Sequence, residues 1–563
     1  MNYQVFPTDP AIRVGTRAGL DYGTVWDQLA RVLLLGMLVL VVLSFQDYGI
    51  TTDEEVQHIY GKELLSFYLS GFQDHSAFHF KDLYLYGGLF DLAVAVLIPV
   101  SPFDEYATRH LLCGLIGVVG VAGTWRLGRV LAGPRAGFLA AAGLALCGVY
   151  YGAMFNNTKD VPFAAGMVWM LYFATRILQQ MPRPSRSAAL KFGLTLGLAL
   201  GIRVGAVFGV FYLGLALLLH LAVVWHLEGR KQMLHDARLS FLILLPALPI
   251  AYVVMAVFWP WAVLNPLNPL EALAAFSRVP LKILTLLNGQ NVLSSDPPAS
   301  YVPMYLAVKL PEALVVGLGV AVAIGTVALL RLESQPWRRH VAVTWVPTVL
   351  GAFVPILVFM LMRPTVYNGI RHFLFVVPPM AVMAAYAADR GWAVAEQWGR
   401  RAGHVFAAAL TVLGVVYLWQ LTSMHPNQYV YYNKFIGGLR GAVGKFELDY
   451  WGNSLHEATQ ELIAFVEREN NGEAPPTTYT LSVCGNPLAV RYDLPPWLKL
   501  VDKDPDWRRA DFFMAFTQVR RCPDLLDGQP ILEINADGVP LSIVKDRRPP
   551  ERKVRAGAQT EAR

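Results

Sequence analysis

The stretch NNTKDVP, at residues 156–162, places two amides, a lysine and a carboxylate between two strongly apolar segments. Ionisable side chains at the edge of a membrane segment usually face the protein interior and mark a site. Lys159 and Asp160 are of this kind. Two more are Arg203, inside LGLALGIRVGAVFGVF, and Arg371, in YNGIRHFLFVVPP. We expect these four side chains to belong to one site.

Carboxylates follow directly on the first apolar run, in TTDEEV at residues 51–56. A solvated acidic loop is the alternative interpretation of this run of charges. Arg and Lys bind phosphate, Arg through its bidentate fork, whereas a carboxylate positions and deprotonates an attacking hydroxyl. A phosphate at the bilayer boundary most simply belongs to a lipid. The residues therefore predict transfer of a group from a lipid phosphate to an acceptor hydroxyl.

The composition of the 563 residues is that of a polytopic α-helical membrane protein, because 55% are hydrophobic and only 16% are charged. In soluble proteins about a quarter of the residues are charged. The net charge of +6 comes from basic residues in short connectors between apolar runs. This is the positive-inside pattern of membrane proteins, so we expect membrane lipids and no nucleic acid as partners.

Twelve apolar runs occur between residues 29 and 421, and five basic connectors between them are predicted to be cytoplasmic. If all twelve runs crossed, the acidic loop after the first run and the first basic connector would share one side. Run 84–100 is short and contains Asp91, so we predict that it lies along or dips into the outer leaflet. About 11 spans then remain within residues 29–423. Residues 1–28 become cytoplasmic, and loops 46–108 and 259–303 face outward.

The composition changes after residue 423. Short strand patterns and a helical pattern at 453–469 predict a small extracytoplasmic α/β domain over residues 424–545. The polar tail 546–563 is predicted to be disordered. Cys484 and Cys522 lie in this domain, where a disulfide and two core thiols are both compatible with the sequence.

Several loose motifs share one order and one side of the membrane. An Asp-Glu pair follows the first span, an interfacial segment follows in the same loop, the connector RLGRVLAGPRA comes next, and a second outward loop ends in Asp. In the order and sidedness of these motifs, residues 25–425 resemble the GT-C superfamily of membrane glycosyltransferases. Within it the resemblance is to the group (family 39) that contains the protein O-mannosyltransferases and the lipid A aminoarabinose transferase. The resemblance implies a polyprenyl-phosphate-linked sugar donor, hexosyl or pentosyl transfer with inversion, Asp53 as general base and Asp160 as second acidic residue.

Roles for the remaining residues follow from this resemblance. Glu54 would orient the base or the acceptor. We expect the donor phosphate to meet Lys159, Arg203, Arg371 and His372, and the substrate to meet Asn156 and Tyr367. The acceptor can be a glycan, a lipid or a protein. The enzyme would lie in the cell inner (plasma) membrane, with its active site and C-terminal domain extracytoplasmic.

Two alternatives stay open. DHSAFHFKD spaces His75 and His79 four residues apart, with Asp74 and Asp82 beside them, so a divalent metal is an option although no cofactor is certain. A transporter of a lipid-linked or small polar solute would also need many spans with ionisable residues. Transporters tend to have symmetric halves and polar breaks near mid-membrane, and neither is visible in this sequence.

Overall fold

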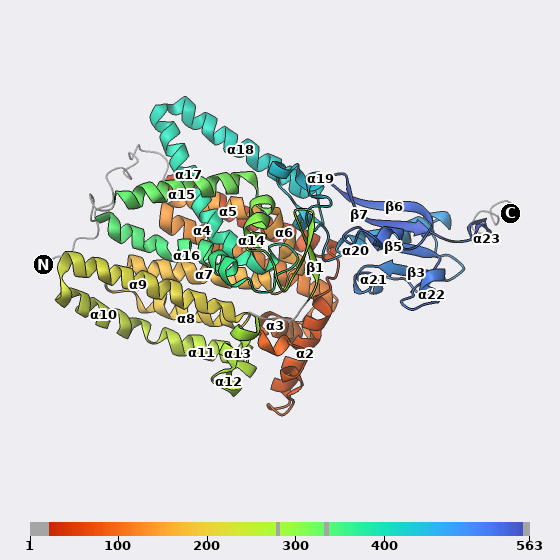
Figure 1. Cartoon of the computed structure of the whole chain (residues 1–563), viewed down its shortest axis with the longest axis horizontal. Helices are drawn as coiled ribbons and strands as arrows, with labels where there is room; N and C mark the ends of the chain where they lie inside the picture. Colours follow the sequence, from red (N-terminus) through yellow and green to blue (C-terminus); the bar gives the residue numbers. More distant parts are fainter. Residues whose placement is uncertain (1–21, 277–281, 332–336, 555–563) are drawn as a thin grey trace.

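The computed structural model describes residues 22–276, 282–331 and 337–554. Figure 1 shows a bundle of long helices with a small domain beside one end. The helices of the bundle and its loops are α1 (Tyr22–Ser44), α2 (Glu54–Leu69), α3 (Leu89–Leu97), α4 (Glu105–Ala132), α5 (Pro134–Ala145), α6 (Gly148–Asn156), α7 (Asp160–Gln179), α8 (Arg186–Leu200), α9 (Val207–Glu228), α10 (Arg230–Leu244), α11 (Ala247–Phe258), α12 (Trp261–Leu264), α13 (Asn268–Phe276), α14 (Tyr301–Lys309), α15 (Glu312–Leu330), α16 (Trp337–Met362), α17 (Val377–Trp398) and α18 (Arg400–Ser423).

Within the described residues, nine helices are long and apolar enough to cross a membrane, and a tenth span exists if α5 and α6, bent by 63°, are counted together. Each of the eleven predicted spans corresponds to a helix or a helix pair. The remaining one is α8, whose 15 residues give about 22 Å of helix, less than the roughly 30 Å of a bilayer core. The chain is thus a multi-span membrane protein, and the predicted fold class is confirmed.

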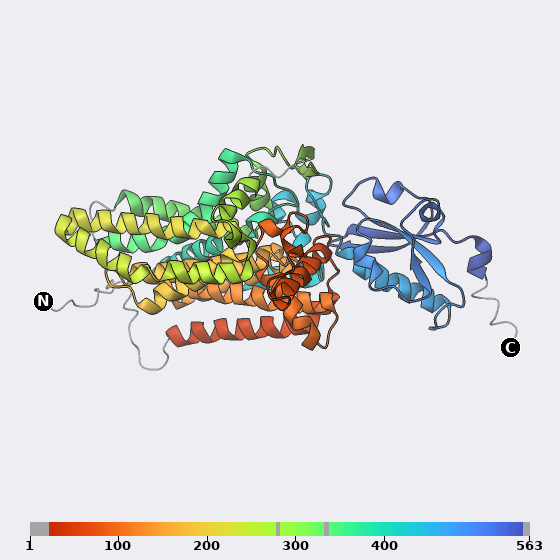
Figure 2. The same cartoon turned by 90° about the horizontal axis from the view of Figure 1, so that it is seen from below.

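Run 84–100 forms α3 and one further turn, an apolar helix from Leu89 to Val100 that is too short to span. Figure 1 places it with α2, α13 and the hairpin of β1 (Leu284–Leu287) and β2 (Gln290–Leu293), at the bundle end that carries the small domain. All long loops between the helices thus gather at this end. The start of α1 and the α9–α10 connection lie at the opposite end (Figure 2).

Two arginines of the predicted connector RLGRVLAGPR, one in the last turn of α4 and one in the first turn of α5, are paired with carboxylates of neighbouring helices. Arg129 binds Asp27 through two bonds of 2.7 Å, and Arg135 donates to Asp389 at 2.7 Å. These ion pairs tie α1 and α17 to the α4–α5 turn. The connector motif therefore has a structural use besides its positive charge.

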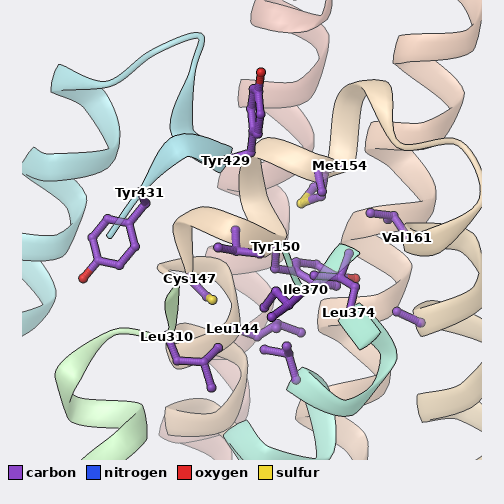
Figure 3. Packing of buried hydrophobic residues seen from close by; sticks show 14 of the residues in the cluster. Leu144, Cys147, Tyr150, Met154, Val161, Leu310, Ile370, Leu374, Tyr429 and Tyr431 are labelled. Carbon is purple, nitrogen blue, oxygen red and sulfur yellow. The ribbon is translucent and has the colours of Figure 1, made fainter. Parts of the chain in front are cut away.

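Helix α4 packs at the centre of the bundle because glycines replace larger side chains along one face. A Cβ at Gly117 would collide with Met154, and one at Gly120 with the Tyr150 hydroxyl. Small residues let membrane helices approach closely, where dispersion contacts rather than hydrophobic transfer hold them together. Figure 3 shows the resulting cluster, in which Tyr150 and Met154 of α6 lie near Tyr429 of the segment that leads to the small domain.

The small domain has a five-stranded sheet of order β4-β3-β5-β7-β6, in which β3 is parallel to β4 and β5 while β7 runs antiparallel to β5 and β6. Its elements are α19 (Gly438–Ala442), α20 (Ser454–Glu469), β3 (Tyr479–Cys484), α21 (Leu488–Arg491), β4 (Leu498–Leu500), α22 (Asp506–Arg509), β5 (Phe512–Phe516), β6 (Gln529–Ala536), β7 (Val539–Asp546) and α23 (Pro550–Val554). Figure 2 shows this domain projecting beyond the bundle.

The structure joins Cys484 to Cys522 in a disulfide, which decides between the two options left by the sequence. Cys113 and Cys147 are free and buried. Of the predicted disordered segments, residues 555–563 lie outside the described residues, and Pro550–Val554 form α23. The predicted cytoplasmic segment 1–28 also lies mostly outside them, since α1 begins at Tyr22.

Candidate functional site

The ionisable residues singled out in the sequence lie at helix ends on the loop side of the bundle. Asp53 precedes α2, and Asp160 is the first residue of α7. Arg203 precedes the short helix η6 (Val204–Ala206), and Arg371 begins η7 (Arg371–Val376). A carboxylate at a helix start is stabilised by the positive end of the helix dipole. Asp53 makes no capping bond with its side chain, so its carboxylate is directed to other partners.

Two carboxylate–arginine pairs form the centre of the site. Arg371 donates to Asp53 at 2.5 Å, and Arg203 pairs with Asp160. The Asp53 side chain is 41% exposed, whereas those of Arg371 and Asp160 are 7% and 5% exposed. Asp53 is therefore the more accessible of the two carboxylates.

Tyr86 connects the second pair to Lys159. The Lys159 ammonium lies 4.0 Å from the centre of the Tyr86 ring, and the Arg203 guanidinium lies 5.7 Å from it. A Cβ on Gly87 would collide with the backbone of Gly201, so only glycine lets this loop lie against the turn that carries Arg203. Tyr86 was not predicted from the sequence, where its only signal is the Gly-Gly pair that follows it.

Lys159 is buried, and its ammonium has no hydrogen bond to any residue that the structure describes. Burial lowers the pKa of Lys159 to about 8, even though nearby carboxylates, Asp91 first, favour its charged form. A buried ammonium without a hydrogen-bonding partner is costly. The lysine is therefore available to an anionic ligand.

The same cluster of charges acts on Asp53. Burial works to raise the pKa of Asp53, but the opposing charge and hydrogen bond of Arg371, with smaller effects of Lys159 and Arg203, hold it below its ordinary value. Asp53 is consequently ionised at neutral pH. That these cations act on Asp53 also shows that the two ion pairs belong to one electrostatic site.

Tyr367 and His372 lie on the Arg371 side of the site. The Arg371 guanidinium is 4.8 Å from the Tyr367 ring centre, and this ring meets the His372 ring edge to face at 5.0 Å. Both side chains are half-buried. The structure thus brings them next to the arginine with which they were predicted to act.

Glu54 and Asn156 point to other partners. Glu54 accepts from the backbone N–H of Thr51 at 2.8 Å and lies 3.0 Å from His110 Nε2. Asn156 donates to Asn453 of the small domain at 3.2 Å. The contacts of Glu54 fix the turn before α2, and those of Asn156 fix the turn before α7.

A buried network that the sequence did not predict lies beneath Lys159. Arg109, at the start of α4, donates to Asp91 at 2.8 Å and to Thr158 at 3.0 Å, and all three side chains are buried. Asp91 had been noted only as a reason to exclude run 84–100 from the spans. An arginine at the start of an apolar run was the available signal for Arg109. The network fixes the residue that precedes Lys159.

The side chains predicted as a metal option do not gather in the structure. Asp74 accepts from Ser66 at 2.6 Å, and His75 Nε2 lies 3.1 Å from the carbonyl oxygen of Phe72. Across the described residues, no group of three His, Cys, Asp or Glu side chains is placed to hold a metal ion.

With this geometry established, the chain was compared with known proteins. The profile of one family, described as dolichyl-phosphate-mannose-protein mannosyltransferase, matches residues 93–261. This range contains Lys159, Asp160 and Arg203. The predicted resemblance to GT-C membrane glycosyltransferases is confirmed. This match leaves Asp53 and Arg371 outside its range, and no curated protein matches the chain.

Solved structures similar to this chain include ArnT from Cupriavidus metallidurans bound to undecaprenyl phosphate, with 14% identity and a TM-score of 0.44 over 92% of this chain and 98% of that one. Another is the oligosaccharyltransferase AglB from Archaeoglobus fulgidus, in complex with an inhibitory peptide and a dolichol-phosphate. It shows 12% identity and a TM-score of 0.43 over 80% of this chain and 62% of that one.

Proposed function

We propose that this chain is an inverting glycosyltransferase that moves a sugar from a polyprenyl-phosphate-linked donor to an acceptor hydroxyl. Asp53 acts as general base, and Lys159, Arg203 and Arg371 bind the donor phosphate. The observation that carries the proposal is the charge of the site. Two ion pairs and the buried Lys159 together leave one positive charge without a carboxylate partner. Such a site is suited to an anion that arrives with the substrate.

The phosphate is assigned to a lipid because the site lies at helix ends of a membrane bundle, where the headgroup of a membrane lipid is located. The name of the matched family, which includes a dolichyl-phosphate sugar, supports the same donor class. Side chains of Tyr86 and Tyr367 lie against the cations. They shield the site from water and strengthen the attraction between phosphate and cations.

The pairing of Asp53 with Arg371 provides a way to activate Asp53 as the proton acceptor when the donor binds. An incoming phosphate competes with Asp53 for the Arg371 guanidinium, which prefers a bidentate oxyanion partner. As this bond lengthens, Asp53 loses the charge and hydrogen bond of Arg371 that lower its pKa, and its proton affinity rises. The acceptor hydroxyl then gives its proton to Asp53 and attacks the sugar, and the phosphate leaves from the opposite face with its charge on the cations.

Sidedness follows from the positive-inside rule. Where the structure describes them, the basic connectors lie at the bundle end opposite to the small domain (Figures 1 and 2), so this rule makes that end cytoplasmic and the site extracytoplasmic. Residues 424–545 and the outward loops then share the site's side. We assign the protein to the plasma (inner) membrane, with a glycan, a lipid or a protein as acceptor.

The test separates transfer from transport. Purified protein in liposomes is given a polyprenyl-phosphate sugar labelled in the sugar, together with candidate acceptors of the three classes. A glycosyltransferase converts the labelled donor to a labelled acceptor and free polyprenyl phosphate. Movement of intact labelled donor or of a free solute across the bilayer, without cleavage of the sugar–phosphate bond, would instead identify a transporter.

A further inference from the structure

One short segment of the chain contacts the loops on both sides of the candidate site. Residues 447–453, ELDYWGN, lie between α19 and α20, and we refer to them as the clamp segment. Its two ends, Glu447 and Asn453, are buried polar side chains, and each is bonded to a loop that carries site residues.

Glu447 holds the loop that carries Arg371. Its carboxylate accepts the backbone N–H of Gly369, two residues before Arg371, at 3.0 Å, and the Tyr301 hydroxyl accepts the same N–H at 3.3 Å. Gly369 and Asn368 both have left-handed backbone angles, with φ of 65° and 58°. Such a turn has few local hydrogen bonds of its own, so an external acceptor has a large effect on its position. Arg371 therefore depends on Glu447 for its approach to Asp53.

Glu447 is itself fixed through its backbone. Its N–H donates to the Tyr305 hydroxyl at 3.2 Å, and its carbonyl accepts from the Tyr432 hydroxyl at 2.6 Å. Burial raises the pKa of Glu447 to about 7. The buried carboxyl is directed to the backbone of the loop that carries Arg371, and this bond points to positioning.

Asn453 holds the loops that carry the two carboxylates. Its Oδ1 accepts from the Gly49 N–H at 2.8 Å and from Asn156 at 3.2 Å. Gly49 lies four residues before Asp53, and Asn156 four residues before Asp160. The Asn453 amide nitrogen donates to Asn427 at 2.7 Å, which fixes the orientation of the amide.

The middle of the clamp segment is fixed to the small domain. Asp449 is fully buried and accepts from the N–H groups of Asn453 and Ser454 at 2.9 and 3.1 Å. These bonds join the segment to the start of α20. The segment is thus anchored in the small domain and bonded at both ends to the membrane part.

We propose that Glu447 and Asn453 are positioning residues, through which the clamp segment holds Arg371 on one side and the Asp53 and Asp160 loops on the other at the separation that the reaction needs. Neither residue touches substrate. This inference rests on the proposed function, since it assumes that Arg371 binds the donor phosphate and that Asp53 is the base.

The first experiment measures binding of a polyprenyl phosphate without sugar to the purified full-length protein in detergent micelles. Glu447→Ala removes the shorter of the two bonds from the Gly369 N–H and leaves the one to the Tyr301 hydroxyl at 3.3 Å. Binding is expected to weaken about tenfold, the effect of one buried hydrogen bond. Glu447→Gln keeps an oxygen at this position and should bind within about threefold of wild type. Exposed Glu461 on α20 supplies the control Glu461→Gln, which should bind as wild type does.

A double-mutant cycle shows whether Glu447 acts through Arg371. When Arg371 is already alanine, adding Glu447→Ala should weaken binding no further, because the group that it positions is gone. If the two effects multiply instead, Glu447 acts independently of Arg371 and the proposal is overturned. Glu447→Met, which keeps side-chain volume without an acceptor, replaces the alanine variant if the latter does not fold.

The second experiment measures sugar transfer with Asn453→Ala. Turnover should fall about tenfold, and adding Asn453→Ala to Asp53→Asn should lower the residual turnover by a clearly smaller factor, because the part that acts through Gly49 and Asp53 is already lost. The control is Asn470→Ala, since the Asn470 side chain donates to the Val466 carbonyl of its own helix. If Asn453→Ala lowered turnover by the same factor in the wild-type and the Asp53→Asn protein, a role of Asn453 in positioning Asp53 would be contradicted. A wild-type protein that binds no polyprenyl phosphate would overturn the proposed function, and this inference with it, whereas normal wild-type binding with unaffected Glu447 variants would overturn the inference alone.

Discussion

At the scale of single residues, the site is defined by an exchange of partners at Arg371. The guanidinium holds the exposed Asp53 carboxylate before substrate binds, and the proposed donor phosphate takes its place. The same residue therefore controls both phosphate binding and the proton affinity of the base. Substitutions at position 371 can therefore separate the effect of the positive charge from the effect of the side-chain geometry.

The first prediction concerns the acid limit of turnover. The charge of Arg371 lowers the pKa of Asp53 against the effect of burial, so Arg371→Ala leaves burial unopposed by this charge and the pKa of Asp53 rises. The pH below which kcat falls, measured at saturating donor, should move upward in Arg371→Ala. Arg371→Lys keeps a charge at this position and should stay near wild type. An unchanged acid limit in Arg371→Ala would show that Asp53 does not control it.

The second prediction concerns Lys159, which has a pKa of about 8 because it is buried. The protonated form dominates below this pH and is lost above it, so phosphate affinity should fall as the pH rises from about 7 to about 9, by up to about tenfold if the ammonium contacts the ligand. Lys159→Arg stays charged over this range and should bind polyprenyl phosphate with little pH dependence. A wild-type affinity that is the same at both pH values would remove Lys159 from the site.

At the scale of elements, close backbone contacts position the site more than side-chain size does. The turn after Tyr86 is in contact with the turn before Arg203 because Gly87 has no Cβ to meet Gly201. Across the same contact, the backbone N–H of Leu89 donates to the Gly201 carbonyl at 2.9 Å. The interfacial run 84–100 is thus the element that brings the Tyr86 ring to the two cations.

The third prediction tests this contact. Gly87→Ala should displace the Tyr86 loop, lower stability by about 1–3 kcal/mol as overpacked sites do, and weaken polyprenyl phosphate binding. Gly36→Ala in α1 is the control, because a Cβ there meets nothing within 4 Å. Thermal unfolding and ligand titration of the two variants measure both effects. Wild-type binding by Gly87→Ala would show that this contact does not position the site.

The sequence was sufficient for the helices and for the candidate residues, but not for their partners. Apolar runs and basic connectors predict spans because bilayer thickness and charge bias act on the local sequence. The pairing of Asp53 with Arg371, separated by 318 positions, depends on how the helices pack. Contacts of Glu54 and Asn156 were likewise set by neighbours distant in sequence, such as His110 and Asn453.

At the scale of the whole molecule, the structure collects the site, the long loops and the small domain at one end of the bundle (Figures 1 and 2). The disulfide between Cys484 and Cys522 agrees with an oxidising compartment on that side. The clamp segment makes the small domain part of the site's support. We therefore expect the isolated membrane part to have a poorly positioned site.

The fourth prediction concerns orientation in the membrane. Cysteines introduced at the exposed positions His75 and Asn291 should react with an impermeant thiol reagent from the extracytoplasmic side, and a cysteine at exposed Lys231 should not. The natural cysteines supply a low background, since two are buried and two are joined. Labelling of only one of the first two positions, or of all three, would contradict the proposed sidedness.

The most direct measurement is the turnover of Asp53→Asn at saturating donor, alongside its binding of polyprenyl phosphate. Asn keeps the size of the side chain but cannot take a proton, so sugar transfer should fall by at least about 100-fold, the lower end of what a positioned base contributes. Binding should be retained, because the phosphate contacts are on other residues and Arg371 is released from its partner. Near-normal turnover of Asp53→Asn would contradict its role as base, and a loss of binding would place Asp53 in the donor site instead.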